Sequence, residues 1–179
     1  MKAVIIVDMI DQFVFGAWAN KRAQVIIGKV ATTAAKVRGD GGIVIATRDS
    51  HLPGDPELRV WGEHAMAKTD SAQLIPELEA LVDFQVTKRT YDSFFETKLD
   101  QLLRANGVTE VIIVGVLTNI CVRHTAAGAF FRGYDITIVS SAVEVLDLET
   151  TEAIALQSAE LEAMKTLYGA RVVNNWEEI

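Results

Sequence analysis

The chain has few of the residues that extracellular and nucleic-acid-binding proteins rely on. It contains one cysteine in 179 residues, so it cannot form an internal disulfide, which fits a reducing compartment. Its 17 Lys and Arg residues are outnumbered by 24 Asp and Glu residues, and no basic cluster offers a surface for a phosphate backbone. We therefore expect no nucleic-acid partner.

Long apolar runs are also missing. No stretch approaches the roughly 18 consecutive apolar residues of a membrane span, and the opening MKAVIIVDMIDQF lacks the charged start and small-residue cleavage site of a signal peptide. Half of the residues are hydrophobic, without repeats or low-complexity tracts, which is typical of a globular chain. We expect one domain over residues 1–179, a cytoplasmic location and no membrane partner.

Buried-strand patterns alternate with amphipathic helix patterns along the chain. Continuous β-branched runs are typical of strands covered on both faces. Such runs predict strands at residues 3–7, 43–46, 84–87, 111–114, 136–139 and 170–173. Helical spacing predicts helices at residues 22–38, 75–81, 97–106, from about 119, and 151–167. The alternation predicts a three-layer α/β/α domain with a mainly parallel sheet.

The segment from residue 50 to 73 has no sustained period. It holds two of the three prolines, two of the three histidines and Trp61. Loops of this length in compact domains usually carry function. We therefore predict a functional loop that contains a short helix.

The single cysteine, Cys121, lies in the first turn of the helix predicted to begin at about Asn119. Unpaired backbone N–H groups and the positive end of the helix dipole favour a thiolate in such a place. Two interpretations are open here. Cys121 is either a nucleophile or a small buried hydrophobic residue.

Polar side chains follow four of the predicted strands. Asp8, Asp49, Lys88 and Cys121 each stand at, or just past, the carboxyl end of a strand. These ends line one rim of an open parallel sheet, where ligands bind. Singly, Asp8 also fits a cap of the next turn, Asp49 a turn residue and Lys88 a solvated surface amine. Together they offer a thiol, a carboxylate to accept its proton and an ammonium to stabilise charge, which acyl transfer requires.

Five motifs carry a family resemblance. They are VDMIDQF at 7–13, TRDSH at 47–51, WGEH at 61–64, KRTYDSF at 88–94 and GVLTNICVRHTA at 115–126. In this order they resemble the isochorismatase-like cysteine hydrolases, and within that superfamily the nicotinamidases and pyrazinamidases. The resemblance implies a six-stranded sheet in the order 3-2-1-4-5-6. It also implies a homo-oligomer, because members commonly assemble as dimers or tetramers.

The resemblance also implies catalytic roles. Cys121 matches the nucleophile of the family, Asp8 its general base and Lys88 its third catalytic residue. The family has a cis peptide bond at the position of Val116–Leu117. The N–H groups of Leu117 and Cys121 would then form the oxyanion hole.

Metal-binding members of the superfamily use an Asp-x-His pair and a later histidine. Asp49, His51 and His64 match these positions, and Glu57 is either a further ligand or a solvated loop charge. Such oxygen and nitrogen ligands suit Zn²⁺, Mn²⁺ or Fe²⁺. We expect a divalent cation, with zinc as the first expectation.

Three further side chains take their interpretation from the family. Phe13 and Trp61 match aromatic positions that pack around the pyridine ring in nicotinamidases, although aromatic residues are more often part of a core. His124 stands one turn after Cys121. A residue three positions on points toward the helix body, and the family gives it no catalytic role, so we interpret it as structural.

The sequence departs from the common nicotinamidase pattern in two places. The loop between His51 and His64 is short, and Ala65 stands where many members have a cysteine. The expected reaction is hydrolysis of nicotinamide, or a close pyridine carboxamide, to the acid and ammonia through a thioester. The alternatives are hydrolysis of N-carbamoyl amides, maleamate or ureidoacrylate.

Two further classes of function compete with catalysis. A non-catalytic interaction module on this fold would have lost the Cys, Lys or Asp, and all three are present. A thiol redox sensor would be expected to have a second cysteine to resolve the oxidised thiol, and the chain has one cysteine.

Overall fold

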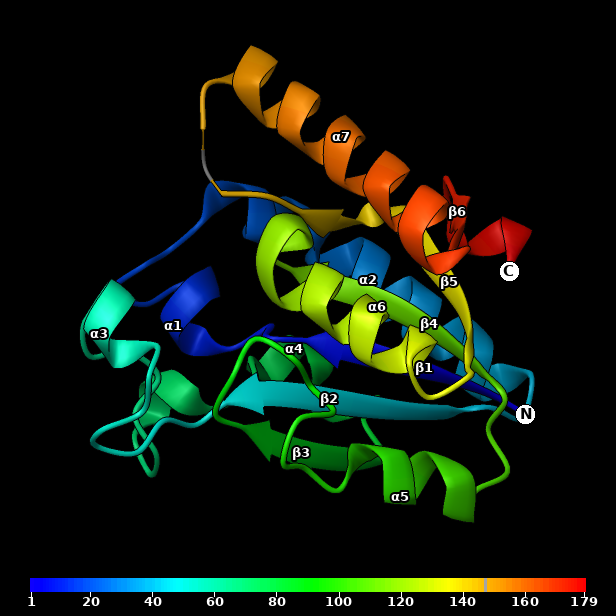
Figure 1. The fold of residues 1–179 in the computed structure, drawn as a ribbon, viewed down its shortest axis with the longest axis horizontal. Coiled ribbons are helices and arrows are strands. Elements are labelled where there is room, and N and C mark those ends of the chain that lie inside the picture. The colour runs from blue at the N-terminus through cyan, green and yellow to red at the C-terminus, as the bar shows by residue number, and fades with distance from the viewer. Residues whose placement is uncertain (147) are drawn as a thin grey trace.

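The structure is a computed structural model that describes residues 1–146 and 148–179. Its strands form a single sheet. In this part of the chain six parallel strands lie in the order β3-β2-β1-β4-β5-β6 (Figure 1), which confirms the predicted order. The strands are β1 (Lys2–Val7), β2 (Ile43–Asp49), β3 (Phe84–Lys88), β4 (Glu110–Val116), β5 (Asp135–Glu144) and β6 (Arg171–Val173).

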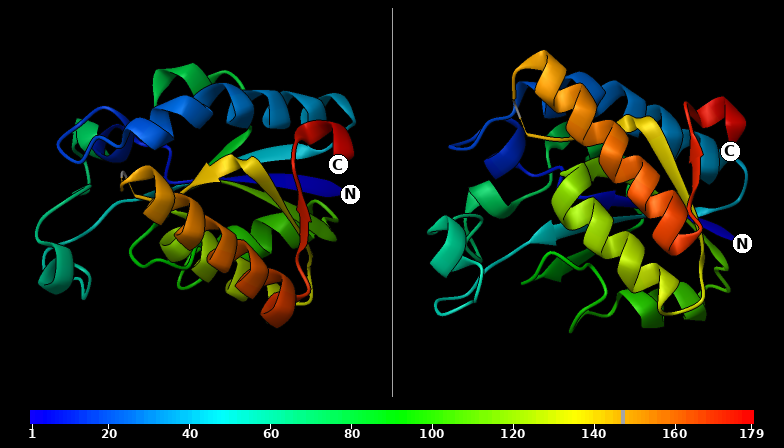
Figure 2. Two further views of the ribbon diagram at one scale, coloured as in Figure 1. Left: turned by 90° about the horizontal axis from the view of Figure 1, so that it is seen from above. Right: turned by 45° about the horizontal axis from the view of Figure 1, so that its top comes forward.

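Helices cover both faces of the sheet, which confirms the three-layer prediction. Figure 2 shows α2 and α4 on one face and α5, α6 and α7 on the other. The helices are α1 (Asp11–Val14), α2 (Lys21–Gly39), α3 (Leu58–Trp61), α4 (Pro76–Glu79), α5 (Leu99–Ala105), α6 (Arg123–Phe130) and α7 (Thr150–Tyr168).

The β-branched runs divide their side chains between two cores. Ile5 and Val7 of β1 belong to the cluster that packs against α5, α6 and α7. Val4 and Ile6 belong to the cluster that packs against α2 and α4. Successive strand residues point to opposite faces, so a strand between two helical layers needs apolar residues at every position.

The strand registers bring the carboxyl ends to one level. Val7 lies opposite Thr47 of β2 and opposite Gly115 of β4. Asp49, the last residue of β2, lies opposite Lys88, the last residue of β3. Figure 1 shows α1 and α3 beyond this rim. The strand order reverses at β1 and β4, which is where open parallel sheets bind ligands.

The structure differs from the prediction at three elements. The short helix α1 was not predicted. Strand β5 runs to Glu144 rather than ending at 139. Two serines interrupt its apolar run, so the pattern predicted an end where the strand continues. The predicted helix from about Asn119 begins instead as a π-helical turn, Thr118–Val122, followed by α6. Val122 N donates to Leu117 O at 3.1 Å, the i to i−5 spacing that defines such a turn.

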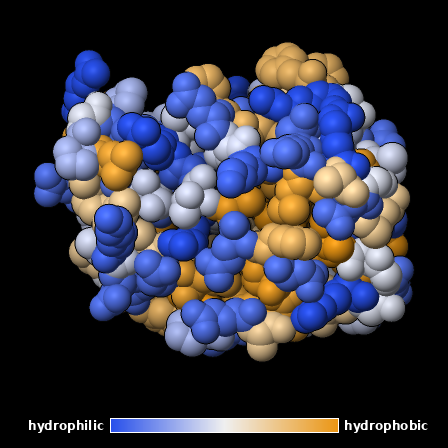
Figure 3. Space-filling view, turned by 90° about the horizontal axis from the view of Figure 1, so that it is seen from below, coloured by the Kyte–Doolittle hydropathy of each residue, from blue (hydrophilic) through white to orange (hydrophobic). Residues whose placement is uncertain are grey.

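The outer edge of the sheet carries exposed aromatic residues. Figure 3 shows the molecule from below the view of Figure 1, the side on which β3 and α5 lie, with apolar side chains between hydrophilic ones. Phe84 of β3 is 38% exposed and Phe95, in the loop before α5, is 51% exposed. The homo-oligomer expected from the sequence stays a prediction. None of the helices among the described residues has the length and apolar character needed to cross a membrane.

We predict that Gly115→Ala destabilises the fold. Gly115 has a φ of 110°, and a Cβ there would lie 2.1 Å from the backbone oxygen of Val7. Both the clash and the positive φ act against alanine, so we expect unfolding free energy to fall by about 3 kcal/mol. Urea unfolding measures the change.

Gly28→Ala is the matched control. Gly28 lies in α2, and an added Cβ would meet no atom within 4 Å. Alanine should raise stability there by about 0.5–1 kcal/mol. An unchanged urea midpoint for Gly115→Ala would show that the close approach of β1 and β4 is not a constraint.

Candidate active site

The rim of the sheet brings Asp8, Asp49, Lys88 and Cys121 together. Lys88 is 1% exposed. Its Nζ lies 2.7 Å from Asp8 Oδ2, 2.5 Å from Asp49 Oδ1 and 3.6 Å from Cys121 Sγ. The Cys121 sulfur also lies within 4.8 Å of a carboxylate oxygen of Asp8 and of Asp49. One ammonium thus faces two carboxylates and the thiol.

The backbone holds the Asp8 carboxylate in place. Asp8 has a φ of 51°, in the left-handed region that Asp tolerates better than most residues. Its Oδ1 accepts a hydrogen bond of 2.9 Å from Asp49 N, while Oδ2 pairs with Lys88. A non-glycine residue in this conformation is often found at a functional site.

Burial and the charges of this group shift the pKa values of its members. Burial raises the pKa of Asp8 to about 6, and Asp49 adds to the rise against the opposing effect of Lys88. Burial also raises the pKa of the Cys121 thiol well above its usual value, helped by Asp8 and Asp49. Although burial opposes its charge, the two carboxylates raise the pKa of Lys88. The cation therefore persists between them.

The thiolate expected from the sequence is thus wrong for this state. Cys121 lies in a π-helical turn rather than in the first turn of an α-helix. It is 7% exposed, and burial together with two nearby carboxylates outweighs the one ammonium. The stable form is a thiol that has carboxylates within reach. The Val116–Leu117 peptide bond is cis, as the family resemblance implied.

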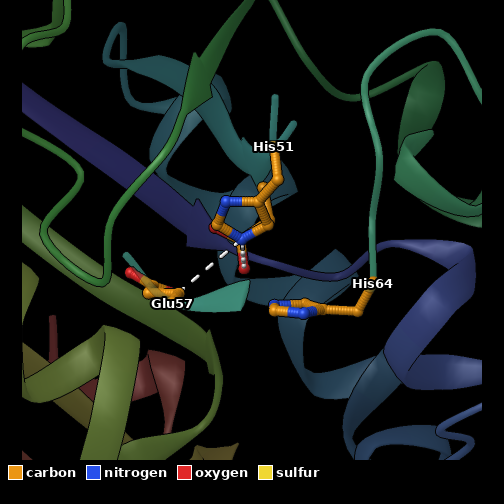
Figure 4. A group of neighbouring side chains, drawn as sticks. His51, Glu57 and His64 are labelled. Carbon is orange, nitrogen blue, oxygen red and sulfur yellow. Dashed lines mark ion pairs between the residues drawn. The ribbon is translucent and has the colours of Figure 1, made fainter. Parts of the chain in front are cut away.

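A second cluster contains the four residues predicted as metal ligands. One donor atom from each of Asp49, His51, Glu57 and His64 lies within 4.8 Å of the others, and all four residues are buried. Figure 4 shows His51, Glu57 and His64 around one small space. His51 Nε2 lies 3.7 Å from Asp49 Oδ2 and 3.7 Å from Glu57 Oε2.

This donor set fits a divalent cation. Within the described residues, His51 Nε2 and Glu57 Oε1 are buried without a hydrogen-bond partner, which calls for an explanation in a folded protein. Burial and the nearby Asp49 raise the pKa of Glu57 to about 7, and a bound cation would oppose both effects by favouring the carboxylate. Two imidazoles and two carboxylates are ligands that Zn²⁺ and related ions bind.

Hydrogen bonds behind the imidazoles orient both rings. His51 Nδ1 lies 3.2 Å from Asp55 Oδ2, and His64 Nδ1 donates to Gly62 O at 2.8 Å. A ligating histidine commonly donates its other ring N–H to a carboxylate or a carbonyl. Both contacts leave Nε2 as the nitrogen available to a cation.

An aromatic pocket joins the thiol to the cation cluster. Trp18 stacks on His64 with ring centroids 4.5 Å apart, and Phe13 lies 6.1 Å from both rings. Trp61, 42% exposed, donates from Nε1 to Tyr91 OH at 2.7 Å. The pocket holds about 590 Å³ of space, counting the solvent at its open mouth. The apolar residues of its lining are Phe13, Trp18, Trp61, Val116, Leu117, Ile120, Cys121 and Leu146.

The predicted substrate contacts, Phe13 and Trp61, therefore both line the pocket, although their role stays a prediction. His124 does not line it. It is exposed, and its Nδ1 contacts Ile120 O of its own turn at 2.7 Å.

Three residues of this region were not predicted from the sequence. Trp18 lies in a segment without a helical or strand pattern, and only its being one of three tryptophans marks it. Asp55 stands four residues after His51 in the same loop, a spacing that allows contact. Tyr91 belongs to the KRTYDSF motif, which the analysis used for its lysine alone.

Comparisons with known proteins agree with this fold. The chain matches the isochorismatase domain family over residues 2–174. Nicotinamidase 3 of Arabidopsis thaliana is 32% identical over 164 residues, covering 88% of this chain and 80% of the relative.

Two solved structures are similar along nearly the whole chain. The N-carbamoylsarcosine amidase of Thermoplasma acidophilum has a TM-score of 0.88 and 35% identity, covering 99% of this chain and 98% of that one. The pyrazinamidase of Pyrococcus horikoshii in complex with zinc has a TM-score of 0.82 and 30% identity, covering 96% and 98%. The chain therefore belongs to the isochorismatase family of hydrolases.

Proposed function

We propose that this protein hydrolyses nicotinamide, or a close pyridine carboxamide, to the acid and ammonia, with Cys121 as the nucleophile. The observation that carries the proposal is the contact of Lys88 with Asp8, Asp49 and Cys121 at the floor of an aromatic pocket. The similarity to a nicotinamidase and a pyrazinamidase supports it.

The first half of the proposed reaction forms a thioester. Asp8 accepts the proton of the Cys121 thiol, and Lys88 stabilises the resulting thiolate. The sulfur attacks the amide carbon, and the N–H groups of Leu117 and Cys121 donate to the developing oxyanion. Protonated Asp8 then gives its proton to the amide nitrogen, the C–N bond breaks and ammonia leaves.

The second half releases the acid. Asp8, again a carboxylate, accepts a proton from a water that attacks the thioester carbon. The C–S bond breaks, and the thiolate takes the proton from Asp8. The products are the carboxylic acid and the free thiol, so one water is consumed for each amide cleaved.

Asp49, His51, Glu57 and His64 would hold a divalent cation at the other end of the pocket. When bound, such an ion supplies an open position to which a pyridine nitrogen can bind. The aromatic residues Phe13, Trp18 and Trp61 would hold the ring, so that its amide reaches Cys121.

The charges of the pocket favour a neutral amide over an amide acid. No Lys or Arg lines the pocket in the described part of the chain, and the nearby Lys88 is already paired with Asp8 and Asp49. Asp49 and Glu57 would also neutralise a bound divalent ion. N-carbamoyl amino acids, maleamate and ureidoacrylate each carry a carboxylate, which would be buried there without a partner.

We predict that neutral pyridine amides are the better substrates. Ammonia release from nicotinamide and pyrazinamide should exceed that from N-carbamoylsarcosine and maleamate by about 100-fold or more in kcat/KM, since a carboxylate without a partner costs about 3 kcal/mol. A coupled ammonia assay measures the panel, with Cys121→Ala as background. Faster turnover of either amide acid would contradict the substrate assignment, and undiminished activity of Cys121→Ala would contradict the mechanism.

We predict that Lys88→Met and Asp8→Asn each lower kcat/KM by about 100-fold or more. The first variant removes the cation that stabilises the thiolate, and the second removes the proton acceptor. Both act on one nucleophile, so their effects should not multiply in the double variant. Melting curves identify any variant that is unfolded in the assay. A double variant whose loss equals the product of the single losses would show that the two residues act separately.

We predict that removal of the cation weakens binding of the pyridine ring without disabling the thiol. Treatment with a chelator, or His51→Ala, should raise KM for nicotinamide far more than KM for benzamide, which has the same shape but no ring nitrogen. Cys121 should still react with iodoacetamide after the cation is removed. Equal effects on the two amides, or a purified protein without a bound divalent ion, would exclude the cation as the anchor.

A further inference from the structure

A buried carboxylate stands behind the cation cluster without belonging to it. Asp55 is 2% exposed, and its Oδ2 accepts a hydrogen bond of 2.9 Å from Leu52 N and lies 3.2 Å from His51 Nδ1. Asp55 has no role in the proposed reaction. Its contacts with neighbouring residues indicate a different role.

Arg89 donates hydrogen bonds to both oxygens of the Asp55 carboxylate. Its Nε lies 3.0 Å from Asp55 Oδ1 and 3.1 Å from Oδ2, and its Nη2 makes a further contact with Oδ1. A planar guanidinium fixes the orientation of a carboxylate, which a lysine ammonium cannot do. The plane of the Asp55 carboxylate is thus set by Arg89.

Arg89 directly follows Lys88 at the end of β3. Successive residues of an extended chain point to opposite sides, so Lys88 reaches the thiol while Arg89 reaches Asp55. The same strand end therefore contacts both the nucleophile and the loop that carries His51.

The Arg89–Asp55 pair determines which nitrogen of His51 faces the cluster. An ionised carboxylate only accepts hydrogen bonds, so His51 must donate from Nδ1. The lone pair is then on Nε2, the atom that lies 3.7 Å from both Asp49 and Glu57 and has no hydrogen-bond partner within the described residues.

We propose that Arg89 is a positioning residue that, through Asp55, holds His51 as an Nε2 ligand and so sets the affinity of the cation site. This inference rests on the proposed function in one respect, namely that the cluster binds a divalent cation. The alternative is an ordinary ion pair at the surface, because the Arg89 side chain is 53% exposed and exposed pairs contribute little to stability.

The affinity for Zn²⁺ distinguishes a positioning role of Arg89 from an ordinary surface ion pair. It is measured without substrate, by competition with a chromogenic chelator. Arg89→Met should weaken Zn²⁺ binding by about 10- to 100-fold, as removal of a group behind a metal ligand typically does. Arg89→Lys keeps the charge but loses the fork, so it should fall between the wild type and Arg89→Met. The matched control is Arg59→Met, which removes an exposed arginine of α3 that has no ion pair within the described residues.

Iodoacetamide alkylation of Cys121, carried out on the metal-free proteins, is the second measurement, and its rate should be the same in all four proteins. Equal Zn²⁺ affinities of Arg89→Met and the wild type would overturn the role of Arg89 and leave the proposed hydrolysis intact. A parallel change in the alkylation rate would also overturn it, because the variant would then have loosened the whole site. A wild type that binds no Zn²⁺ would overturn both this role and the cation anchor, while ammonia release still tests Cys121 separately.

Discussion

The ammonium of Lys88, buried between Asp8 and Asp49, is the interaction on which the site depends. Loss of one partner from such a group leaves a buried charge without compensation, at a cost of about 3–5 kcal/mol. The three residues come from the ends of three neighbouring strands, so they meet only if these strands end at one level. The registers of β1, β2 and β3 meet this requirement, with Asp49 opposite Lys88.

Asp49 joins the two clusters of the pocket. Its Oδ1 pairs with Lys88, while its Oδ2 faces His51 Nε2. Although burial opposes ionisation, Lys88 lowers the pKa of Asp49. The Asp49 carboxylate thus stays ionised and contacts both clusters. A cation bound in the second cluster would be stabilised by the negative charge of Asp49. The same charge raises the pKa values of Asp8 and Cys121. The two ends of the pocket are therefore coupled through one side chain.

The sequence predicted those parts of the structure that depend on local patterns. Runs such as residues 3–7 reveal strands with two covered faces, and strand ends reveal which polar side chains meet at the rim. The π-helical turn at Cys121 left no signal, because one turn, Thr118–Val122, is too short to show a period of its own. The pKa of the thiol was predicted with the wrong sign, since its largest shift comes from burial, which is set by tertiary packing rather than by the local helix terminus. Arg89 and Asp55 lie 34 residues apart, so no local pattern could pair them.

A protonated thiol has a consequence for the proposed reaction. Because burial and two carboxylates favour the thiol form of Cys121, in the proposed reaction the thiolate would form only as Asp8 accepts the proton. Asp8 then already holds the proton that the departing ammonia needs, and its pKa of about 6 lets it both accept and release a proton near neutral pH. Asp8, whose negative charge opposes the thiolate in the resting site, would thus become the acid that protonates the leaving group.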